Sequence, residues 1–79
     1  MSERTYRIFS IVAYDLSDNR GIVLSRTQLL DAIWNIAGDF VNDNTLTVYI
    51  KRLREKLEED PQNPEIIKTV RGLGYKVEA

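Results

Sequence analysis

The sequence contains neither histidine nor cysteine, and these two absences exclude several kinds of chemistry. A Ser-His-Asp triad, a histidine-ligated zinc site and an imidazole base all require histidine. Without cysteine the chain has no disulfide bond and no thiolate ligand for a metal, which fits a reducing compartment. The remaining carboxylates, tyrosines and lysines form no pattern typical of a catalytic pocket. We therefore expect a cytoplasmic protein that is not an enzyme, with no metal and no cofactor.

Long apolar runs are also absent from the sequence. No stretch approaches the ~18 apolar residues of a membrane-spanning helix, and the N-terminal segment TYRIFSIVAY is interrupted by polar residues. We expect neither a signal peptide nor a membrane partner. The 79 residues suffice for a single small domain, which we place at residues 1–79. A domain of this length buries only about 60 to 65% of its unfolded surface, so we expect marginal stability.

The net charge of −1 hides an uneven distribution of basic residues. One basic group lies within six positions and a second follows near the C-terminus: Lys51, Arg52, Arg54 and Lys56, then Lys68, Arg71 and Lys76. The acidic run Glu58-Glu59-Asp60 separates the two groups. Because a polyanion responds to local charge rather than to net charge, these basic surfaces are compatible with nucleic-acid binding.

Apolar residues at helical spacing predict three helices, at residues 4–17, 26–36 and 44–59. The second helix has the strongest start signal, because Ser25 and Gln28 have the spacing of a capping box. Either Asn42 or Asn44 is a suitable N-cap for the third helix. That helix should end before Pro61, since proline disfavours helical backbone at the residue that precedes it.

Two further segments are typical of short β-structure. Residues 22–24, Ile-Val-Leu, are a strand candidate, and residues 65–78 form a predicted hairpin with two glycines in its turn. Residues 37–43 are a predicted loop. The resulting order of helix, strand, helix, loop, helix and hairpin is the plan of a winged helix-turn-helix. The fold class is therefore mainly α with a small β part, in which the hairpin is the wing.

The predicted third helix separates apolar and polar residues onto opposite faces. At about 100° per residue, one stripe points to the core and contains Leu46, Ile50, Leu53 and Leu57. Val48, Arg52 and Glu55 lie opposite this stripe. This outer side suits a DNA major groove, where an arginine donates two hydrogen bonds to guanine and a valine methyl packs on thymine. The alternatives are a solvated basic face with one exposed valine, which is common on protein surfaces, or a helix that docks on another protein.

Two longer segments resemble the effector domain of OmpR/PhoB-type response regulators. Residues 23–34 read VLSRTQLLDAIW, and residues 44–77 read NTLTVYIKRLREKLEEDPQNPEIIKTVRGLGYKV. The second segment is similar to the family pattern T-V-x-V-x-I-x-x-L-R-x-K-L, followed by a proline-bearing turn and T-V-R-G-x-G-Y. The likeness is continuous over residues 22–77 and implies a sequence-specific DNA-binding module of a bacterial two-component transcription regulator.

The resemblance implies roles for individual residues. The third helix would be the recognition helix, with Arg52 reading guanine. The family positions that face DNA are, in this sequence, Thr45, Thr47, Val48, Tyr49, Lys51, Arg52 and Arg54. Arg26 and Trp34 match positions that touch the phosphate backbone, although Trp34 fits core packing equally well. In the wing, Thr69 would hold a phosphate and Arg71 would enter an A·T-rich minor groove, its alternative being a turn arginine in solvent.

The resemblance also implies macromolecular partners. Double-stranded promoter DNA would be bound at direct-repeat half-sites by a dimer or a tandem pair. Residues 37–43 match the segment that the family uses to contact RNA polymerase or a neighbouring protomer. Phe40 and Val41 in this loop fit ordinary core packing equally well.

Two features of the family are not found in this sequence. Effector domains of this kind begin with a small antiparallel sheet, whereas only three residues precede the first predicted helix. We therefore expect apolar surface on that helix to mediate self-association or to lower stability. The family's receiver domain, with its phosphoacceptor aspartate, is likewise not in these 79 residues, and no phosphorylation site is assigned. A second interpretation stays open, a degenerate winged helix that acts as a protein-interaction or dimerisation module.

Overall fold

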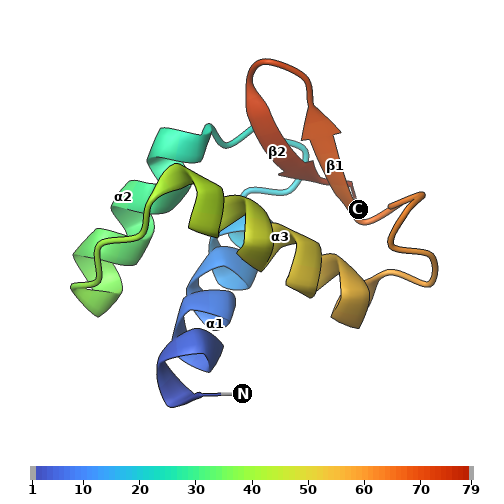
Figure 1. Ribbon diagram of the computed structural model, residues 1–79. Helices are drawn as coiled ribbons and strands as arrows, with labels where there is room; N and C mark the ends of the chain where they lie inside the picture. The colour runs from blue at the N-terminus through green and yellow to red at the C-terminus, as the bar shows by residue number, and fades with distance from the viewer. Residues whose placement is uncertain (1, 79) are drawn as a thin grey trace.

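A computed structural model describes residues 2–78 and shows three helices followed by a two-stranded antiparallel hairpin (Figure 1). In chain order the elements are α1 (Glu3–Asp18), α2 (Arg26–Ala37), α3 (Asp43–Leu57), β1 (Ile67–Val70) and β2 (Gly74–Val77). Helix α3 crosses α1, with α2 on one side and the hairpin above (Figure 1). This arrangement confirms the predicted winged helix-turn-helix.

Each helix begins at a polar side chain that caps its first turn. Ser2 Oγ accepts a backbone N–H of the first turn of α1 at 3.1 Å. Ser25 and Gln28 form the predicted capping box, in which each side chain accepts a hydrogen bond from the other residue's backbone N–H. Asn42, one of the two predicted candidates, caps α3 through a 2.8 Å bond to its side-chain oxygen. Local polar side chains therefore set where all three helices start.

The predicted strand at residues 22–24 does not form. Only Leu24 pairs, in an isolated antiparallel bridge with Tyr75 of β2, where the two backbone N–H groups donate to each other's carbonyl oxygens at 2.8 and 3.0 Å. The ladder stops there because Ser25 already caps α2. Gly74 lies against this bridge, and a Cβ at that position would overlap the carbonyl oxygen of Leu24. Glycine is therefore required for β2 to approach this closely.

The wing hairpin begins later than predicted, with β1 starting at Ile67 rather than at Glu65. The backbone N–H groups of Glu65 and Ile66 donate to the carboxylate of Glu58 at 2.8 and 2.9 Å. The N–H groups of these two residues are therefore bound to the end of α3, although the carbonyl of Ile66 still accepts the backbone N–H of Glu78 at 3.1 Å. From Ile67, which pairs with Val77, the two strands run in register to the glycine-containing turn.

The core lies where the three helices and the hairpin meet. Its most deeply buried side chains are Ile8, Val12 and Leu16 of α1, Leu29 and Ile33 of α2, Leu46 and Ile50 of α3, and Ile67 of β1. Leu57, which the sequence places in the core stripe, is instead about half exposed. Helix α3 ends at Leu57, and the following residue, Glu58, takes the buried position. No helix within residues 2–78 combines the length and the apolar character that crossing a bilayer requires.

Candidate nucleic-acid interface

Three exposed side chains of α3, Val48, Lys51 and Arg52, form what we call the outer face. Val48 is 45% exposed, so it points away from the core as expected. Arg52 lies one turn further along on the same side, because residues four apart are neighbours on a helix surface. Neither Lys51 nor Arg52 forms an ion pair with another residue in the range 2–78. Methyl groups and an unengaged guanidinium therefore lie next to each other on solvent-facing surface.

Tyr49 faces the core rather than the outer side of α3. Its side chain is 7% exposed, and its ring packs edge-on against Phe9 of α1 with 5.3 Å between ring centroids. Tyr49 is three residues from Leu46 and four from Leu53, so it shares their buried face. This geometry corrects the role implied by the resemblance and removes Tyr49 from the DNA-facing residues.

Arg26, an implied phosphate contact, is held by three other residues of the protein. Its Nε donates to Asp43 Oδ1 at 2.8 Å, its Nη1 donates to the Tyr75 hydroxyl at 2.6 Å, and its Nη2 donates to the Asp43 carbonyl and to Thr47 Oγ1. The hydrogen bond to Asp43 raises the pKa of Arg26 against the opposing effect of burial. Four of the five guanidinium N–H groups are thus used within residues 2–78, and Arg26 joins α2, α3 and β2.

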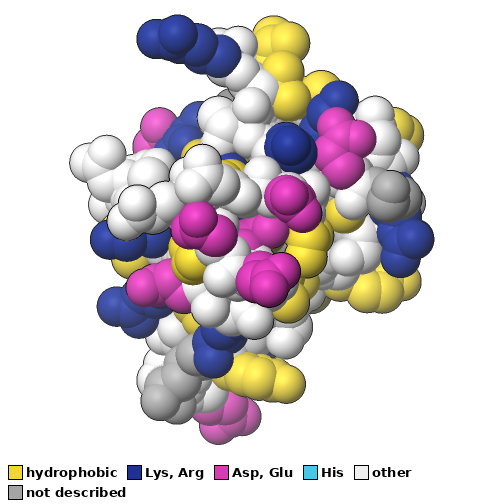
Figure 2. All heavy atoms as spheres, turned by 90° about the vertical axis from the view of Figure 1, so that its right-hand side faces the viewer, with side chains coloured by type: hydrophobic (Ala, Val, Ile, Leu, Met, Phe, Trp, Pro, Cys, Tyr) yellow, Lys and Arg dark blue, Asp and Glu magenta, His cyan; other side chains and the backbone are white. Residues whose placement is uncertain are grey.

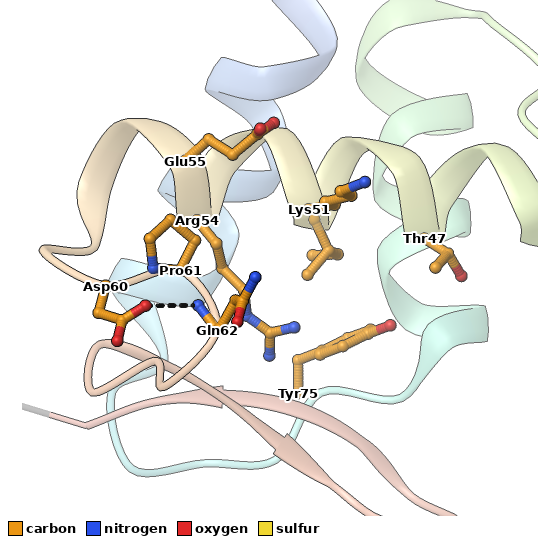
Figure 3. A pocket seen from close by; sticks show the side chains of 9 residues that line it. Thr47, Lys51, Arg54, Glu55, Asp60, Pro61, Gln62 and Tyr75 are labelled. Atoms are coloured by element: carbon orange, nitrogen blue, oxygen red, sulfur yellow. Dashed lines mark hydrogen bonds between the residues drawn. The ribbon is translucent and has the colours of Figure 1, made fainter.

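Arg54, implied to face DNA, turns toward the wing instead. Its Nε and Nη2 donate to the carbonyl of Ile67 at 3.2 and 2.9 Å, and Nη2 also donates to Thr69 Oγ1 at 2.7 Å. Figure 3 looks into the cleft between α3 and the hairpin and shows Arg54 reaching from the helix to the strands, while Glu55 points away from them. The guanidinium of Arg54 therefore connects α3 to the wing.

Tyr75 of β2 contacts both of these arginines. The guanidinium carbons of Arg26 and Arg54 lie 5.7 and 5.8 Å from the centroid of its ring. Both distances are within the range of about 6 Å at which a cation is attracted to an aromatic ring. The only signal in the sequence is its place at the end of the T-V-R-G-x-G-Y pattern, which does not say what the ring touches.

The tip of the wing carries Arg71 and Leu73, both of which are exposed. Gly72 lies between them with φ of +77°, a left-handed conformation that glycine adopts without strain. Thr69, an implied phosphate contact on β1, is also exposed, but its Oγ1 already accepts a hydrogen bond from Arg54. Its hydroxyl hydrogen is still available as a donor to an outside acceptor.

Glu58 is buried, with 8% of its side chain exposed, directly after the end of α3. Its carboxylate accepts the backbone N–H groups of Glu65, Ile66 and Ile67 at distances between 2.7 and 3.0 Å. Burial acts to raise the pKa of Glu58, but the three backbone donors and the charge of Arg54 outweigh it and lower the pKa below its ordinary value of 4.5. This carboxylate anchors the base of β1 to α3, a role that no sequence motif signalled.

Trp34 and Phe40 lie near the N-terminal end of α3, around the loop at residues 37–43. Trp34 is 57% exposed, so the structure favours its surface interpretation over core packing. Phe40 is 80% exposed, whereas Val41 is buried in the core. Val41 therefore packs in the core, whereas Phe40 lies at the surface. The rings of Phe40 and Trp34 border the same cleft.

Charge is distributed unevenly around α3. Figure 2 faces the end of the molecule where residues 58–66 connect α3 to the hairpin, and it shows carboxylates near the centre with basic side chains toward the margins. The acidic residues that border this end are Glu58, Glu59, Asp60 and Glu65. A polyanion would be repelled from this end and attracted to the basic residues of the outer face and of the wing tip.

The chain matches the family model described as Transcriptional regulatory protein, C terminal, over residues 3–77. The chain belongs to this family. The match to the transcriptional regulatory C-terminal family begins in α1, whereas the resemblance read from the sequence begins at residue 22, so α1 is part of the family's domain. The family is one of regulatory domains and not of enzymes.

One curated relative in this family is the sensory transduction protein RegX3 of Mycolicibacterium smegmatis. It is 54% identical over 71 residues, which cover 89% of this chain and 30% of the relative. This transcriptional regulatory C-terminal domain therefore spans less than a third of the length of that relative.

Two solved structures share the fold of this transcriptional regulatory C-terminal domain. The response regulator DrrB of Thermotoga maritima, an OmpR/PhoB homologue, superimposes with a TM-score of 0.76 at 32% identity over 100% of this chain and 33% of DrrB. The RstA DNA-binding domain of Klebsiella pneumoniae, solved in complex with the RstA box, superimposes with a TM-score of 0.71 at 29% identity over 99% of this chain and 72% of that domain. The resemblance to OmpR/PhoB-type domains is confirmed.

Proposed function

We propose that this chain binds double-stranded DNA sequence-specifically, as the effector module of a bacterial two-component transcription regulator. The observation that carries the proposal is the outer face of α3, where Val48 and Arg52 are exposed next to each other and Arg52 has no ion-pair partner within the described residues. An α-helix is about 10–12 Å across, which matches the major groove of B-DNA at about 12 Å. The fold match to a DNA-binding domain solved with its DNA box supports the same function.

In this proposal α3 lies in the major groove with its outer face against the base edges. Arg52 donates two hydrogen bonds to O6 and N7 of a guanine, and Val48 packs on a thymine methyl group. Lys51 contacts a phosphate as a flexible point charge. Thr45, in the first turn of α3, donates a hydroxyl hydrogen bond to a phosphate where the helix enters the groove. The hydroxyl of Thr47 accepts from Arg26 and donates to the carbonyl of Asp43, so we leave Thr47 out of these contacts.

The wing and α2 hold the backbone on either side of α3. Arg71 at the wing tip enters the adjacent minor groove, where a narrow A·T-rich sequence has an enhanced negative potential. Thr69, Trp34 and the remaining N–H of Arg26 contact phosphates and set the register of the protein on the duplex. Arg54 is turned to the wing, so we leave it out of these contacts. A chain that acts on promoter DNA works in the cytoplasm, and we place it there.

A salt titration with two matched substitutions tests this proposal. Binding sites are selected from random duplexes, and affinity for the selected site is measured between about 50 and 200 mM salt, where a protein that contacts phosphates loses affinity steeply. Arg52→Ala should cost about 1–3 kcal/mol of binding free energy and relax the base preference at one position. Lys51→Ala should weaken binding to all duplexes about equally and reduce the salt slope by about one.

Two outcomes would count against the proposal. Equal losses for both variants on every duplex would contradict base reading by Arg52. No binding of the unchanged chain to any duplex at low salt would contradict DNA binding altogether and favour the protein-interaction alternative. Both side chains are exposed, so circular dichroism spectra and melting temperatures of the two variants should match those of the unchanged chain, which serves as the control.

We further propose that two copies bind direct-repeat half-sites and that residues 37–43 contact RNA polymerase. The exposure of Phe40 supports the polymerase contact, because an aromatic side chain of this kind on a loop is available to a protein partner. Phe40→Ala should leave DNA affinity unchanged and lower transcription from a promoter in a reconstituted assay. Loss of DNA affinity in this variant would assign Phe40 to the DNA contact or to the fold instead.

Self-association through α1 is a second candidate function for the molecule. Tyr6 and Tyr14 are exposed on α1, and Tyr14 borders an apolar cleft together with Ile11 and the exposed Ile36 of α2. Large exposed apolar side chains that cluster are typical of protein-interaction sites. Sedimentation should therefore show concentration-dependent dimers that Tyr14→Ser weakens, and a monomer at high concentration would contradict this candidate.

A further inference from the structure

We infer that Arg54 and Tyr75 form a clamp that holds the wing at a defined position relative to α3. The inference rests on the proposed DNA binding and deepens it, because the resemblance implies that Arg54 touches DNA directly. In our inference Arg54 is a positioning residue: it acts on DNA affinity through the wing, whose tip carries Arg71.

The hydrogen bonds of Arg54 fix both the distance and the direction of its side chain. Two of its nitrogen atoms donate to the carbonyl oxygen of Ile67, and one of these also donates to Thr69 Oγ1, so three of its five N–H groups are directed at β1. A planar guanidinium with a rigid fork of donors holds two acceptors in one geometry, which a lysine ammonium on a flexible stem cannot do. The contact with β1 therefore depends on the rigid fork of donors that arginine has and lysine lacks.

Tyr75 closes the clamp from β2. Its ring lies against the guanidinium of Arg54, and its hydroxyl accepts a hydrogen bond from Nη1 of Arg26 at 2.6 Å. Figure 3 shows the ring lying beneath α3, with its hydroxyl directed toward the end of the helix that carries Thr47. Arg26 also binds Asp43 at the start of α3. The hydroxyl of Tyr75 is therefore tied to the start of α3 through Arg26, and its ring contacts Arg54 further along the same helix.

Backbone packing alone does not place the wing against α3. In the part of the chain that the structure describes, β2 packs on α1, whereas no comparable packing joins either strand to α3. The link to α3 is made by side chains, with Glu58 at the base of β1 and Arg54 one turn earlier on the helix. Without Arg54, the hairpin would keep the contacts of Glu58 at its base but lose the hydrogen bond to Thr69, which lies nearer its tip.

The position of the wing matters because the two proposed DNA readers lie on different elements. Arg52 would occupy the major groove while Arg71 occupies the adjacent minor groove of the same duplex. Both contacts form together only if the angle between α3 and the wing matches the DNA. A clamp that is already closed in the free protein lowers the ordering cost of binding, since fewer side chains and segments are immobilised in the complex.

A double-mutant cycle on the selected duplex tests the inference. Arg54→Lys keeps the positive charge but loses the fork, so it should lower affinity at least about fivefold in the otherwise unchanged chain. Combined with Arg71→Ala, which already removes the wing contact, the same substitution should lower affinity less than about twofold. A direct phosphate contact predicts the reverse, because a lysine serves a phosphate nearly as well and independent contacts add.

The matched control is the cycle of Val48→Ala with Arg71→Ala, which should be additive within about twofold because Val48 lies on the outer face and does not line the cleft between α3 and the hairpin. If Arg54→Lys retains affinity, or if its effect adds to that of Arg71→Ala, the inference is overturned while DNA binding stands. If the unchanged chain binds no duplex, the proposed function fails first, and the inference fails with it. The two failures are therefore distinguishable.

A second variant, Tyr75→Phe, tests the clamp independently in case Arg54→Lys does not fold. Tyr75→Phe keeps the ring and both guanidinium groups but removes the acceptor for Arg26. It should lower affinity by about two- to fivefold, and this loss should also disappear in the Arg71→Ala background. A Tyr75→Phe effect that adds to Arg71→Ala would show that the hydroxyl contacts DNA itself and would overturn the positioning role. Circular dichroism and a cooperative melt verify that each variant is folded.

Discussion

Arg52 and Arg54 are two positions apart on α3, yet their surroundings are opposite. Arg52 is exposed on the outer face and forms no ion pair within residues 2–78. Arg54 is half-buried, where it donates hydrogen bonds to the carbonyl of Ile67 and the hydroxyl of Thr69. A step of two residues turns an α-helix by about 200°, which places the two side chains on opposite sides of the helix.

The comparison separates two regions with different uses. The outer face presents side chains that are available to a ligand, so changes there should alter binding and leave stability intact. The wing junction, which we define as Arg54, Glu58, Gly74 and Tyr75, engages its polar groups inside the protein. Changes at the wing junction should therefore lower the free energy of unfolding first.

Gly74→Ala should have the largest effect, because it breaks the wing junction at its backbone. The new Cβ would overlap the carbonyl of Leu24, and the φ of +153° at this position strains any other residue. We expect a loss of about 3 kcal/mol or more in the free energy of unfolding. Chemical denaturation followed by circular dichroism measures this loss.

Gly72→Ala is the matched control for this substitution. Gly72 has a φ of +77°, but a Cβ there would meet no atom within 4 Å. Only backbone strain remains, so the expected loss is about 1 kcal/mol. Equal losses for the two variants would show that the close contact between β2 and Leu24 does not contribute to the free energy of unfolding. Gly74 would then no longer belong to the wing junction.

Glu58→Gln should have the next largest effect on stability. The substitution removes the negative charge that accepts three backbone N–H groups at the base of β1, and hydrogen bonds to a charged acceptor are stronger than neutral ones. We expect a loss of about 2 kcal/mol in the free energy of unfolding. The neighbouring Glu59 is exposed, so Glu59→Gln should leave the free energy of unfolding nearly unchanged. A similar loss in both variants would contradict a special role of the Glu58 carboxylate.

Acid should weaken the wing junction through the same carboxylate, by less than the substitution does. The pKa of Glu58 is lowered below 4.5 in the folded protein, so its contribution is fully present above that value and is lost as pH falls through the folded pKa. The pKa of Asp60 is lowered by hydrogen bonds from Asn63 and Gln62, and its contribution is lost in the same direction. The pKa of Asp15 is raised by burial and by Asp18, which opposes the trend.

Thermal melts between neutral pH and the acid range measure this effect. The melting temperature should fall as pH drops below about 4.5, and the fall should be smaller in Glu58→Gln, which has no carboxylate at this position to protonate. An identical pH dependence in the two proteins would place the acid sensitivity elsewhere in the chain.

Val48→Ala should have the smallest effect and should act only on DNA binding. The substitution removes methyl groups that would pack on thymine, so we expect a loss of about 0.5–1 kcal/mol of binding free energy. Its free energy of unfolding should not change measurably, because Val48 is on the outer face. Replacing the contacted thymine by uracil should abolish the difference between the two proteins, and persistence of the difference would contradict this contact.

The helices and their starts were predictable because their signals are local. The capping box of Ser25 with Gln28, the asparagine before α3 and the helical spacing of Leu46, Ile50 and Leu53 all act within a few residues. The same spacing predicted that Val48 and Arg52 would point outward. For these features, residues near in sequence are also the residues that interact.

Other features were missed because they depend on residues that are distant in sequence. Residues 22–24 have the composition of a strand, but only Leu24 finds a partner before α2 begins. Tyr49 occupies a family position that was expected to face DNA, but Phe9 of α1 provides it with a buried partner. Glu58 belongs to an acidic run that looks solvated, until the segment after α3 folds back and presents three N–H groups to it.

The sequence by itself determined the order of the elements, the caps that start the helices and the separation of α3 into an inner and an outer side, because each of these follows from spacing along the chain. Only the tertiary structure decided that Arg52 is left open to a ligand while Arg54 and Glu58 are engaged by the wing. A guanidinium or a carboxylate binds whichever partner lies within reach, and that partner is set by how the hairpin packs against the helices.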